Sequence, residues 1–192
     1  MGNRGEKMKS VLISIQPKWV EKIASGKKTI EVRKTRPKIK KPFKCYIYMS
    51  QGDLKDLGQY SELIYKNRKK VIGEFICDKV YNLVNAFGGI MFADENLNQL
   101  EPQLFRDMSC LTDDKTADYL GDKDGYGWHI SDLKIYDNPK ELSEFRPICK
   151  FDGKDAICAL FCTNWKYDGG LFFECTRKVT RPPQSYMYVE EL

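Results

Sequence analysis

The chain has 192 residues, of which 42% are apolar, so it can bury one hydrophobic core and is close to the size of a single domain. No stretch approaches the roughly 20 apolar residues that span a bilayer, and residues 1–10 lack the apolar centre of a secretory signal, which predicts a soluble cytoplasmic protein with no membrane partner. The net charge of +5 is uneven, because residues 1–44 hold 14 Lys/Arg against three acids, a local net charge of +11. A basic patch of this kind suits a polyanionic partner, although a solvated lysine-rich surface is the alternative.

The first elements form a strand, one short helix and a second strand. Residues 11–15 are apolar and rich in β-branched side chains, which is typical of a buried strand. Residues 17–25 have proline in the first turn and apolar side chains at helical spacing, and Gly26 ends this helix. Residues 29–33 alternate strictly between apolar and polar, which predicts a strand with Glu31 and Arg33 on one face.

The middle of the chain predicts two more strands separated by polar segments. A basic linker over residues 35–44 leads into a strand at residues 45–49, and a second strand follows at residues 71–77. The connection over residues 50–70 is polar and predicts one short helix. Residues 82–103 show no clean period, so we interpret them as an excursion from the fold.

The C-terminal half carries a helix signal and two strand signals. Residues 112–114 form an N-cap signature for a helix that continues through residues 117–120. The strand predicted at residues 125–130 contains Trp128 as a core residue and runs on until Pro139 breaks it. The last strand is predicted at residues 184–189.

Many short strands with few helices predict an α+β fold, a small β-barrel with accessory helices. We expect one domain over residues 8–192, preceded by a flexible N-terminus at residues 1–7. Insertions are expected at about residues 50–70, 82–118 and 146–180. The last of these has two turn signals and predicts an antiparallel meander.

Four spaced residues run from the end of the first helix into the second strand: Gly26, Lys28, Glu31 and Arg33. Gly26 permits a sharp turn that brings Lys28 to the start of the strand. Lys28 and Arg33 are donors suited to phosphate or to a base oxygen, and Glu31 can orient the Arg33 guanidinium or accept from a base amino group. The alternative is a structural salt bridge at the rim of the barrel.

This Gly-x-Lys-x-x-Glu-x-Arg spacing resembles the GxKxxExR motif of ASCH domains, and its place between helix and strand is where that family has it. The resemblance covers roughly residues 10–145 and 180–192, and the later segments are similar to a phage-associated or prophage-associated branch. It implies a PUA-like barrel with a cleft along the motif, and it suggests RNA as the ligand.

We therefore expect a nucleic-acid-binding module, with RNA as the partner and single-stranded DNA as a further candidate. The basic segment would hold phosphates while the cleft reads an unpaired nucleotide. His129, Gln184 and Ser185 are expected to add contacts from two other strands. The predicted binding residues are Lys28, Glu31, Arg33, Lys34, Arg36, Lys38, Lys40, Lys41, His129, Gln184 and Ser185.

Two other function classes stay open. Some proteins similar to ASCH domains hydrolyse acylated cytidine, and others are linked to ribonuclease activity, so a hydrolase in the same cleft is the alternative. In the amidohydrolase type a threonine stands three residues after the motif lysine, where this chain has Glu31, so we assign no catalytic residue. A protein-interaction adaptor using residues 94–144, with 13 acids against five bases, lacks a defined recognition motif.

The seven cysteines form no CxxC pair, which favours reduced thiols over a disulfide framework. Four of them lie in or beside the predicted meander, at Cys149, Cys158, Cys162 and Cys175, and invite a structural zinc site. On a continuous strand, Cys158 and Cys162 would lie about 13 Å apart, too far for one tetrahedral site. We therefore expect no cofactor and no metal.

Overall fold

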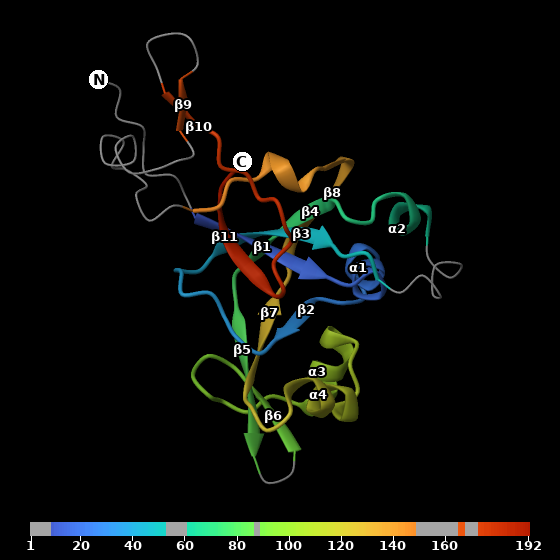
Figure 1. Ribbon diagram of the computed structural model, residues 1–192. Coiled ribbons are helices and arrows are strands. Elements are labelled where there is room, and N and C mark those ends of the chain that lie inside the picture. The colour runs from blue at the N-terminus through green and yellow to red at the C-terminus, as the bar shows by residue number, and fades with distance from the viewer. Residues whose placement is uncertain (1–8, 53–60, 87–88, 149–164, 168–172) are drawn as a thin grey trace.

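The computed structural model describes residues 9–52, 61–86, 89–148, 165–167 and 173–192 (Figure 1). Most of the strands belong to two sheets, and Figure 1 shows the larger sheet above the smaller one. None of the helices in these residues is long and apolar enough to cross a membrane.

The larger sheet has five strands, and the apolar run predicted at the start of the chain lies beside its central strand. In spatial order the strands are β11 (Tyr186–Glu190), β1 (Lys9–Ile15), β3 (Phe43–Met49), β4 (Val71–Cys77) and β8 (Ser131–Lys140). The β1–β3 pair is parallel, and the other pairs are antiparallel. The parallel pair requires a crossover, which contains α1 (Pro17–Ala24) and the motif strand.

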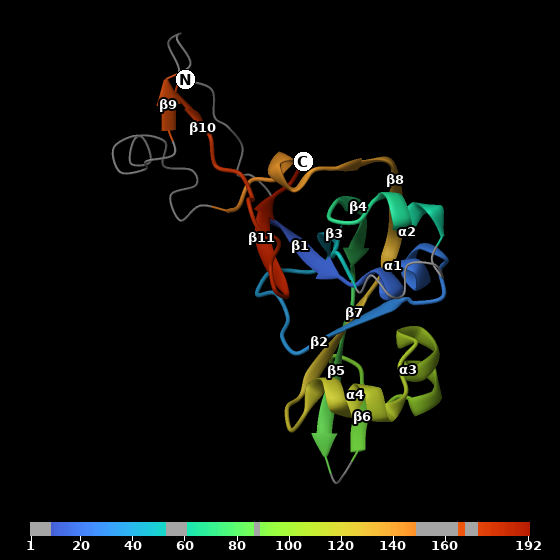
Figure 2. The same cartoon turned by 45° about the vertical axis from the view of Figure 1, so that its right-hand side comes forward.

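The smaller sheet has four antiparallel strands. Their spatial order is β2 (Ile30–Arg33), β7 (Gly125–His129), β5 (Val80–Ala86) and β6 (Gly89–Ala93). Two helices, α3 (Pro102–Ser109) and α4 (Asp113–Leu120), pack beside this sheet (Figure 2). A short helix α2 (Glu62–Lys66), a 3-10 turn η2 (Leu142–Glu144) and a hairpin of β9 (Trp165–Tyr167) with β10 (Phe173–Cys175) complete the elements.

Both faces of β1 are covered, which explains its continuous apolar sequence. Val11, Ile13 and Ile15 pack with the apolar face of α1 in one cluster, while Leu12 packs with Phe145 in another. A third cluster joins the four-stranded sheet to α3 and α4, and it includes Ile30, Val32, Leu83, Phe92, Phe105 and Leu120. Because Ile30 and Val32 face these helices, the alternation of the strand turns Glu31 and Arg33 to the other side.

Three expectations about the fold need correction. The described strands form open sheets with no pairing that closes either one, so the closed barrel is not seen among these residues. The strand predicted to run from residue 125 to Pro139 is two strands in different sheets, with Asp132 at a positive φ of 46° beside the junction. Pro139 lies inside β8, which tolerates it because an edge strand leaves one row of backbone groups without a ladder partner.

The third correction concerns residues 82–103, which were interpreted as an excursion from the fold. They hold β6, most of β5 and the start of α3, and so contribute to the four-stranded sheet and its cover. The pattern was hard to interpret because Asn82 and Asn85 interrupt the apolar period of β5. Both side chains form hydrogen bonds with the backbone: Asn82 donates to the carbonyl of Asp94 (2.8 Å) and Asn85 to that of Gly121 (2.9 Å).

Candidate functional site

The motif lysine lies inside the protein. Gly26, with a φ of 73°, follows α1 and directs the chain back so that Lys28 is only 2% exposed. The Lys28 Nζ donates to the Ser109 carbonyl at 2.7 Å and lies 3.5 Å from the Glu31 Oε2. It also lies 5.1 Å from the centroid of the Trp19 ring. Lys28 therefore joins α1, β2 and the end of α3.

The other two charged motif residues form the contact that the sequence predicts. The Arg33 NH2 lies 3.0 Å from the Glu31 Oε1, and both side chains are 8% exposed. The same NH2 donates to the Ser14 carbonyl at 2.5 Å, which links β2 to the end of β1 in the other sheet. Glu31 is thus held by a cation on each of its two carboxylate oxygens.

Burial also sets the electrostatics of this cluster. Desolvation lowers the pKa of Lys28 below its ordinary value of 10.5, and the nearby Glu31 carboxylate opposes this shift. Two cations against one carboxylate leave the cluster positively charged when all three groups are ionised. A ligand with negative charge is therefore favoured beside it.

The motif residues line a pocket of about 750 Å³, within the usual range for small-ligand sites. Lys18 and Trp19 of α1 contribute to its lining, and α4 contributes Lys115, Asp118 and Tyr119. Strand ends and the C-terminal segment add further lining, including Ser14, Tyr48, Ser50, Pro183 and Gln184.

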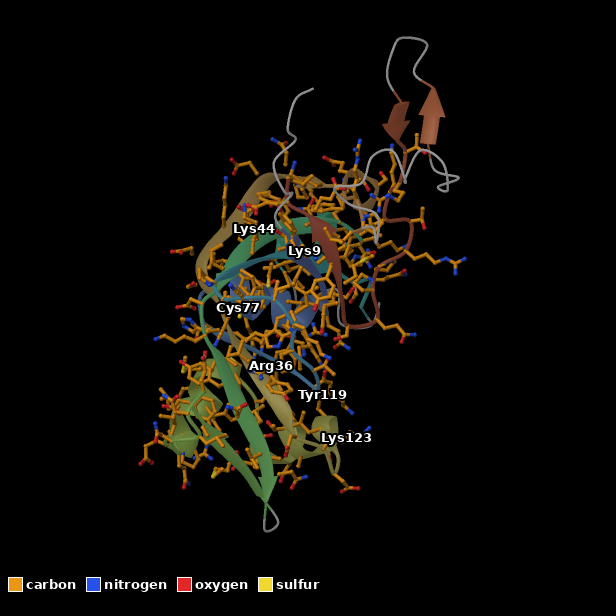
Figure 3. All side chains as sticks on the ribbon, turned by 90° about the vertical axis from the view of Figure 1, so that its left-hand side faces the viewer. Lys9, Arg36, Lys44, Cys77, Tyr119 and Lys123 are labelled. Carbon is orange, nitrogen blue, oxygen red and sulfur yellow. The ribbon has the colours of Figure 1, made fainter. Side chains whose placement is uncertain are left out.

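The basic segment, the linker predicted over residues 35–44, is docked on the protein. The Arg36 guanidinium lies 5.4 Å from the Tyr126 ring centroid, and Lys41 forms an ion pair with Glu95. Lys44 lies 2.8 Å from Glu191. Figure 3 shows Lys44 on the five-stranded sheet, apart from Arg36 and from Tyr119 of the pocket wall.

Three lysines in or directly before this segment remain accessible. Lys34 is exposed, with its ammonium 5.3 Å from the Tyr119 ring centroid at the pocket wall. Lys38 and Lys40 are exposed, and neither side chain has an ion pair within the described part of the chain. These three lysines are therefore better placed for a polyanion than Lys41 or Lys44.

The structure separates His129 from the other predicted residues. Its Nδ1 lies 2.6 Å from the Asp78 Oδ1, and the ring does not line the pocket. Gln184 does line the pocket, whereas Ser185 contributes its carbonyl, which accepts from the Ser14 backbone at 3.0 Å. The neighbouring Pro183 carbonyl accepts from the Ser14 hydroxyl at 2.6 Å, so this segment is fixed against β1.

Sequence reasoning missed the contribution of α4. The Thr112 N-cap signal located this helix, but no periodicity told which strand or pocket it would face. Lys115, Asp118 and Tyr119 share one face because residues three and four apart are neighbours on a helix. Their spacing in the sequence was the signal from which a common polar face of this helix could have been predicted.

The four cysteines considered for a zinc site lie in residues 149–175. Cys149, Cys158 and Cys162 lie outside the described residues, and only the backbone of Cys175 is described. Among the described side chains, no group of three His, Cys, Asp or Glu could hold a metal ion. Cys45 and Cys77 are buried free thiols, and burial raises the pKa of Cys77 to about 12.

The two sheets, the crossover and the charged pocket define an α+β protein with a pocket beside the helix-to-strand turn. The family model of the ASCH domain matches residues 13–81, which include the crossover and the motif.

Solved structures agree with this assignment of the fold. Two crystal structures of ZmASCH mutant proteins from Zymomonas mobilis are similar, with 16% and 18% sequence identity and TM-scores of 0.50 and 0.52. Each match covers 95% of this chain and 91% or 89% of the ZmASCH chain. At this identity the likeness is one of fold. A comparison of the sequence with curated proteins found no match.

Proposed function

We propose that this protein binds RNA, with an unpaired nucleotide in the motif pocket and the neighbouring phosphates on the lysines around it. The observation that carries the proposal is the pocket itself, where buried cations, exposed lysines and aromatic rings converge. ASCH is a PUA-like family for which RNA binding is often proposed, and this supports the nucleic acid over other polyanions.

The pocket residues fall into two groups, those that form the pocket surface and those that can contact the RNA. Lys28, Glu31 and Arg33 bind one another and shape a positively charged pocket surface. Lys18 on α1 and Lys34 after β2 are exposed, Lys18 in the pocket lining and Lys34 at the pocket wall, where each can reach a phosphate. Trp19 is half-buried in the lining and offers a ring for base stacking, which is tolerant of sequence.

A titration of fluorescently labelled single-stranded RNA tests the proposal. Replacing Lys18 and Lys34 together by Gln should weaken binding and lower the slope of log affinity against log salt by up to about 1.4, at about 0.7 per phosphate contact. The matched control is Lys134→Gln, an exposed lysine on β8 that does not line the pocket. Equal binding by the parent and the double variant at two salt concentrations would contradict the proposal.

Two further arms of the same titration separate the related proposals. Single-stranded DNA of the same sequence measures the preference for RNA, which can sense the 2′-hydroxyl. The hydrolase alternative is tested by incubating the protein with acylated cytidine and with the RNA itself. We expect no turnover, because Glu31 stands where the amidohydrolase type has threonine and both of its oxygens are held by cations.

A further inference from the structure

Helix α4 contributes two oppositely charged side chains to the pocket wall. Lys115 and Asp118 both line the pocket, and neither side chain makes a hydrogen bond or an ion pair within the described part of the chain. They are three residues apart on one helix face, so their charged groups can engage adjacent atoms of one ligand.

Asp118 has no partner for its carboxylate among the described residues, whereas Glu31, the other acid in the pocket lining, does. The oxygens of Glu31 are held by Lys28 and Arg33, at 3.5 and 3.0 Å. Asp118 is exposed and keeps both oxygens available. In a pocket rich in lysines, a free carboxylate disfavours phosphate beside it and favours a ligand with hydrogen-bond donors.

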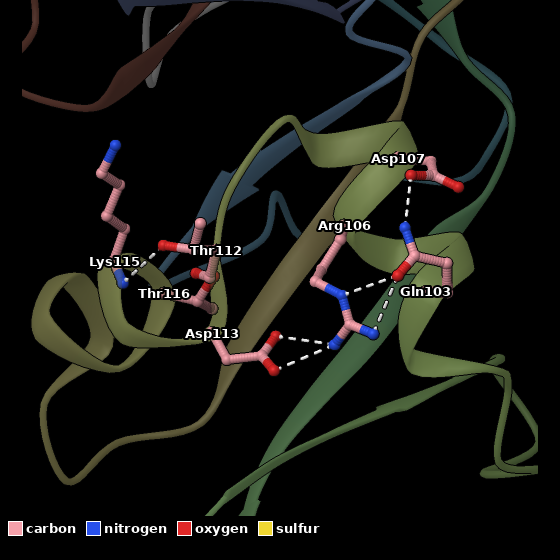
Figure 4. Close-up of polar contacts among 7 residues, drawn as sticks. All are labelled: Gln103, Arg106, Asp107, Thr112, Asp113, Lys115 and Thr116. Carbon is pink, nitrogen blue, oxygen red and sulfur yellow. Dashed lines mark hydrogen bonds and ion pairs between the residues drawn. The ribbon is translucent and has the colours of Figure 1, made fainter.

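The helix is held in place, so the two side chains start from a fixed backbone (Figure 4). The Thr112 Oγ1 caps α4 by accepting from the Lys115 backbone N–H at 3.4 Å. Arg106 of α3 bridges the two helices, donating to the Asp113 carboxylate at 2.9 and 3.3 Å and to Gln103 at 3.0 and 3.1 Å. Figure 4 shows the Lys115 side chain extending away from this network.

We propose that Asp118 and Lys115 select guanine as the base in the pocket, an inference that rests on the proposed function. The Watson–Crick edge of guanine places the O6 acceptor beside two donors, N1–H and the N2 amino group. The Asp118 carboxylate can accept both donors in parallel while the Lys115 ammonium donates to O6.

The other bases match this pair less well. Adenine and cytosine each offer one amino donor, and the ring nitrogen beside it is an acceptor that a carboxylate repels. Uracil offers one N–H between two carbonyl oxygens. Only guanine therefore satisfies both oxygens of Asp118, and single-stranded RNA is the form in which this edge is accessible.

The test uses four RNA nonamers that differ only at the central position, which holds G, A, C or U between uridines. We expect the parent to bind the G oligonucleotide about tenfold more tightly than the U oligonucleotide. Asp118→Asn should bring the ratio of the G affinity to the U affinity close to one, whatever the change in overall affinity, because the variant loses the carboxylate that accepts from both guanine donors. The control is Asp122→Asn, an exposed acid just beyond α4 that does not line the pocket, and it should keep the preference.

Inosine at the central position gives a second measurement, because it lacks only the 2-amino group. The parent should bind the inosine oligonucleotide severalfold more weakly than the G oligonucleotide, and Asp118→Asn should bind the two equally. Equal affinity of the parent for all four bases, or a guanine preference that survives Asp118→Asn, would overturn this inference and leave the RNA proposal standing. Absence of binding to every oligonucleotide would overturn both.

Discussion

Lys28, Glu31 and Arg33 form one buried ion-pair cluster that keeps a net positive charge when all three groups are ionised. Each is buried, and the Glu31 carboxylate is shared between the other two side chains. Backbone carbonyls at Ser14 and Ser109 accept further hydrogen bonds from the two cations. The motif is therefore first a structural cluster, and in the proposed function it acts on the ligand through the charge and shape that it gives the pocket.

Replacing Glu31 by Gln should destabilise the protein. The change leaves two buried cations without their shared anion, and breaking a buried ion pair in this way costs about 3–5 kcal/mol. Urea unfolding should show this loss in the free energy of unfolding. Glu62→Gln, which removes an exposed partner of Lys66 on α2, is the control and should leave the midpoint unchanged. Equal midpoints for Glu31→Gln and the parent would show that the cluster adds nothing to stability.

The burial of Lys28 should also give stability a specific pH dependence. Its pKa is lower in the folded protein than its ordinary value of 10.5, so near that pH the unfolded chain binds more protons at this site than the folded one. Stability from Lys28 therefore rises with pH, from the lowered folded pKa up to about 10.5. Buried thiols and tyrosines act in the opposite direction, because burial raises their pKa.

Comparison of the parent with Lys28→Met isolates this contribution, since the other groups are common to both. The difference in free energy of unfolding, parent minus variant, should increase between neutral pH and about pH 10. A difference that stays constant over this range, measured by urea unfolding at several pH values, would contradict the burial of a titrating Lys28.

At the scale of elements, the fold pairs some lysines of the basic segment between β2 and β3 with acids and leaves others exposed. The Lys38 backbone N–H donates to the Tyr188 hydroxyl at 2.7 Å, and the Arg36 carbonyl accepts from the Tyr186 hydroxyl at 3.0 Å. The segment is thus tied to β11. Its lysines divide into paired ones, Lys41 and Lys44, and exposed ones.

This division predicts unequal effects on RNA binding. Replacing Lys38 and Lys40 together by Gln should flatten the slope of log affinity against log salt by up to about 1.4 units, at about 0.7 for each phosphate contact. Replacing Lys41 and Lys44 by Gln should change the slope less, because their acidic partners already neutralise them. The measurement is a titration of one RNA at four salt concentrations. Equal slopes for the two double variants would mean that the ion pairs do not decide which lysines meet phosphate.

The whole molecule makes the pocket from segments that are far apart in the chain. Lys28 and Trp19 come from the N-terminal third, Asp118 from the middle and Gln184 from near the C-terminus. The strands are likewise interdependent, since β1 pairs with β11, β2 with β7 and β4 with β8. The segment matched by the ASCH family model, residues 13–81, contains only one strand of each pair.

A fragment of residues 9–81 should therefore not fold. It would expose one edge of β1, β2 and β4 and remove Trp128, which packs at the centre of the main core with 0% exposure. Circular dichroism and thermal melting of the fragment should show no cooperative transition, whereas the full chain should show one. A cooperative melt of the fragment would mean that the remaining strands are accessory.

Much of the secondary structure follows from local patterns in the sequence. The β-branched runs at β1 and β4, the Pro17 and Gly26 limits of α1, and the Thr112 cap of α4 each have a local cause. The Glu31–Arg33 contact also follows from the two-residue period of a strand. The division of β7 from β8 could not be predicted in this way, because a continuous apolar pattern does not tell which sheet each half joins.

The tertiary structure decided which charges are available to a ligand. The sequence predicted the motif and the basic segment, but local patterns could not show that Lys28 would be buried against α3, that Lys41 would pair with Glu95, or that His129 would pair with Asp78. It also brought the Lys115–Asp118 face of α4 to the motif, about 85 residues away along the chain. Such contacts depend on how the two sheets pack, and burial and pairing between distant residues have no period in the sequence from which to predict them.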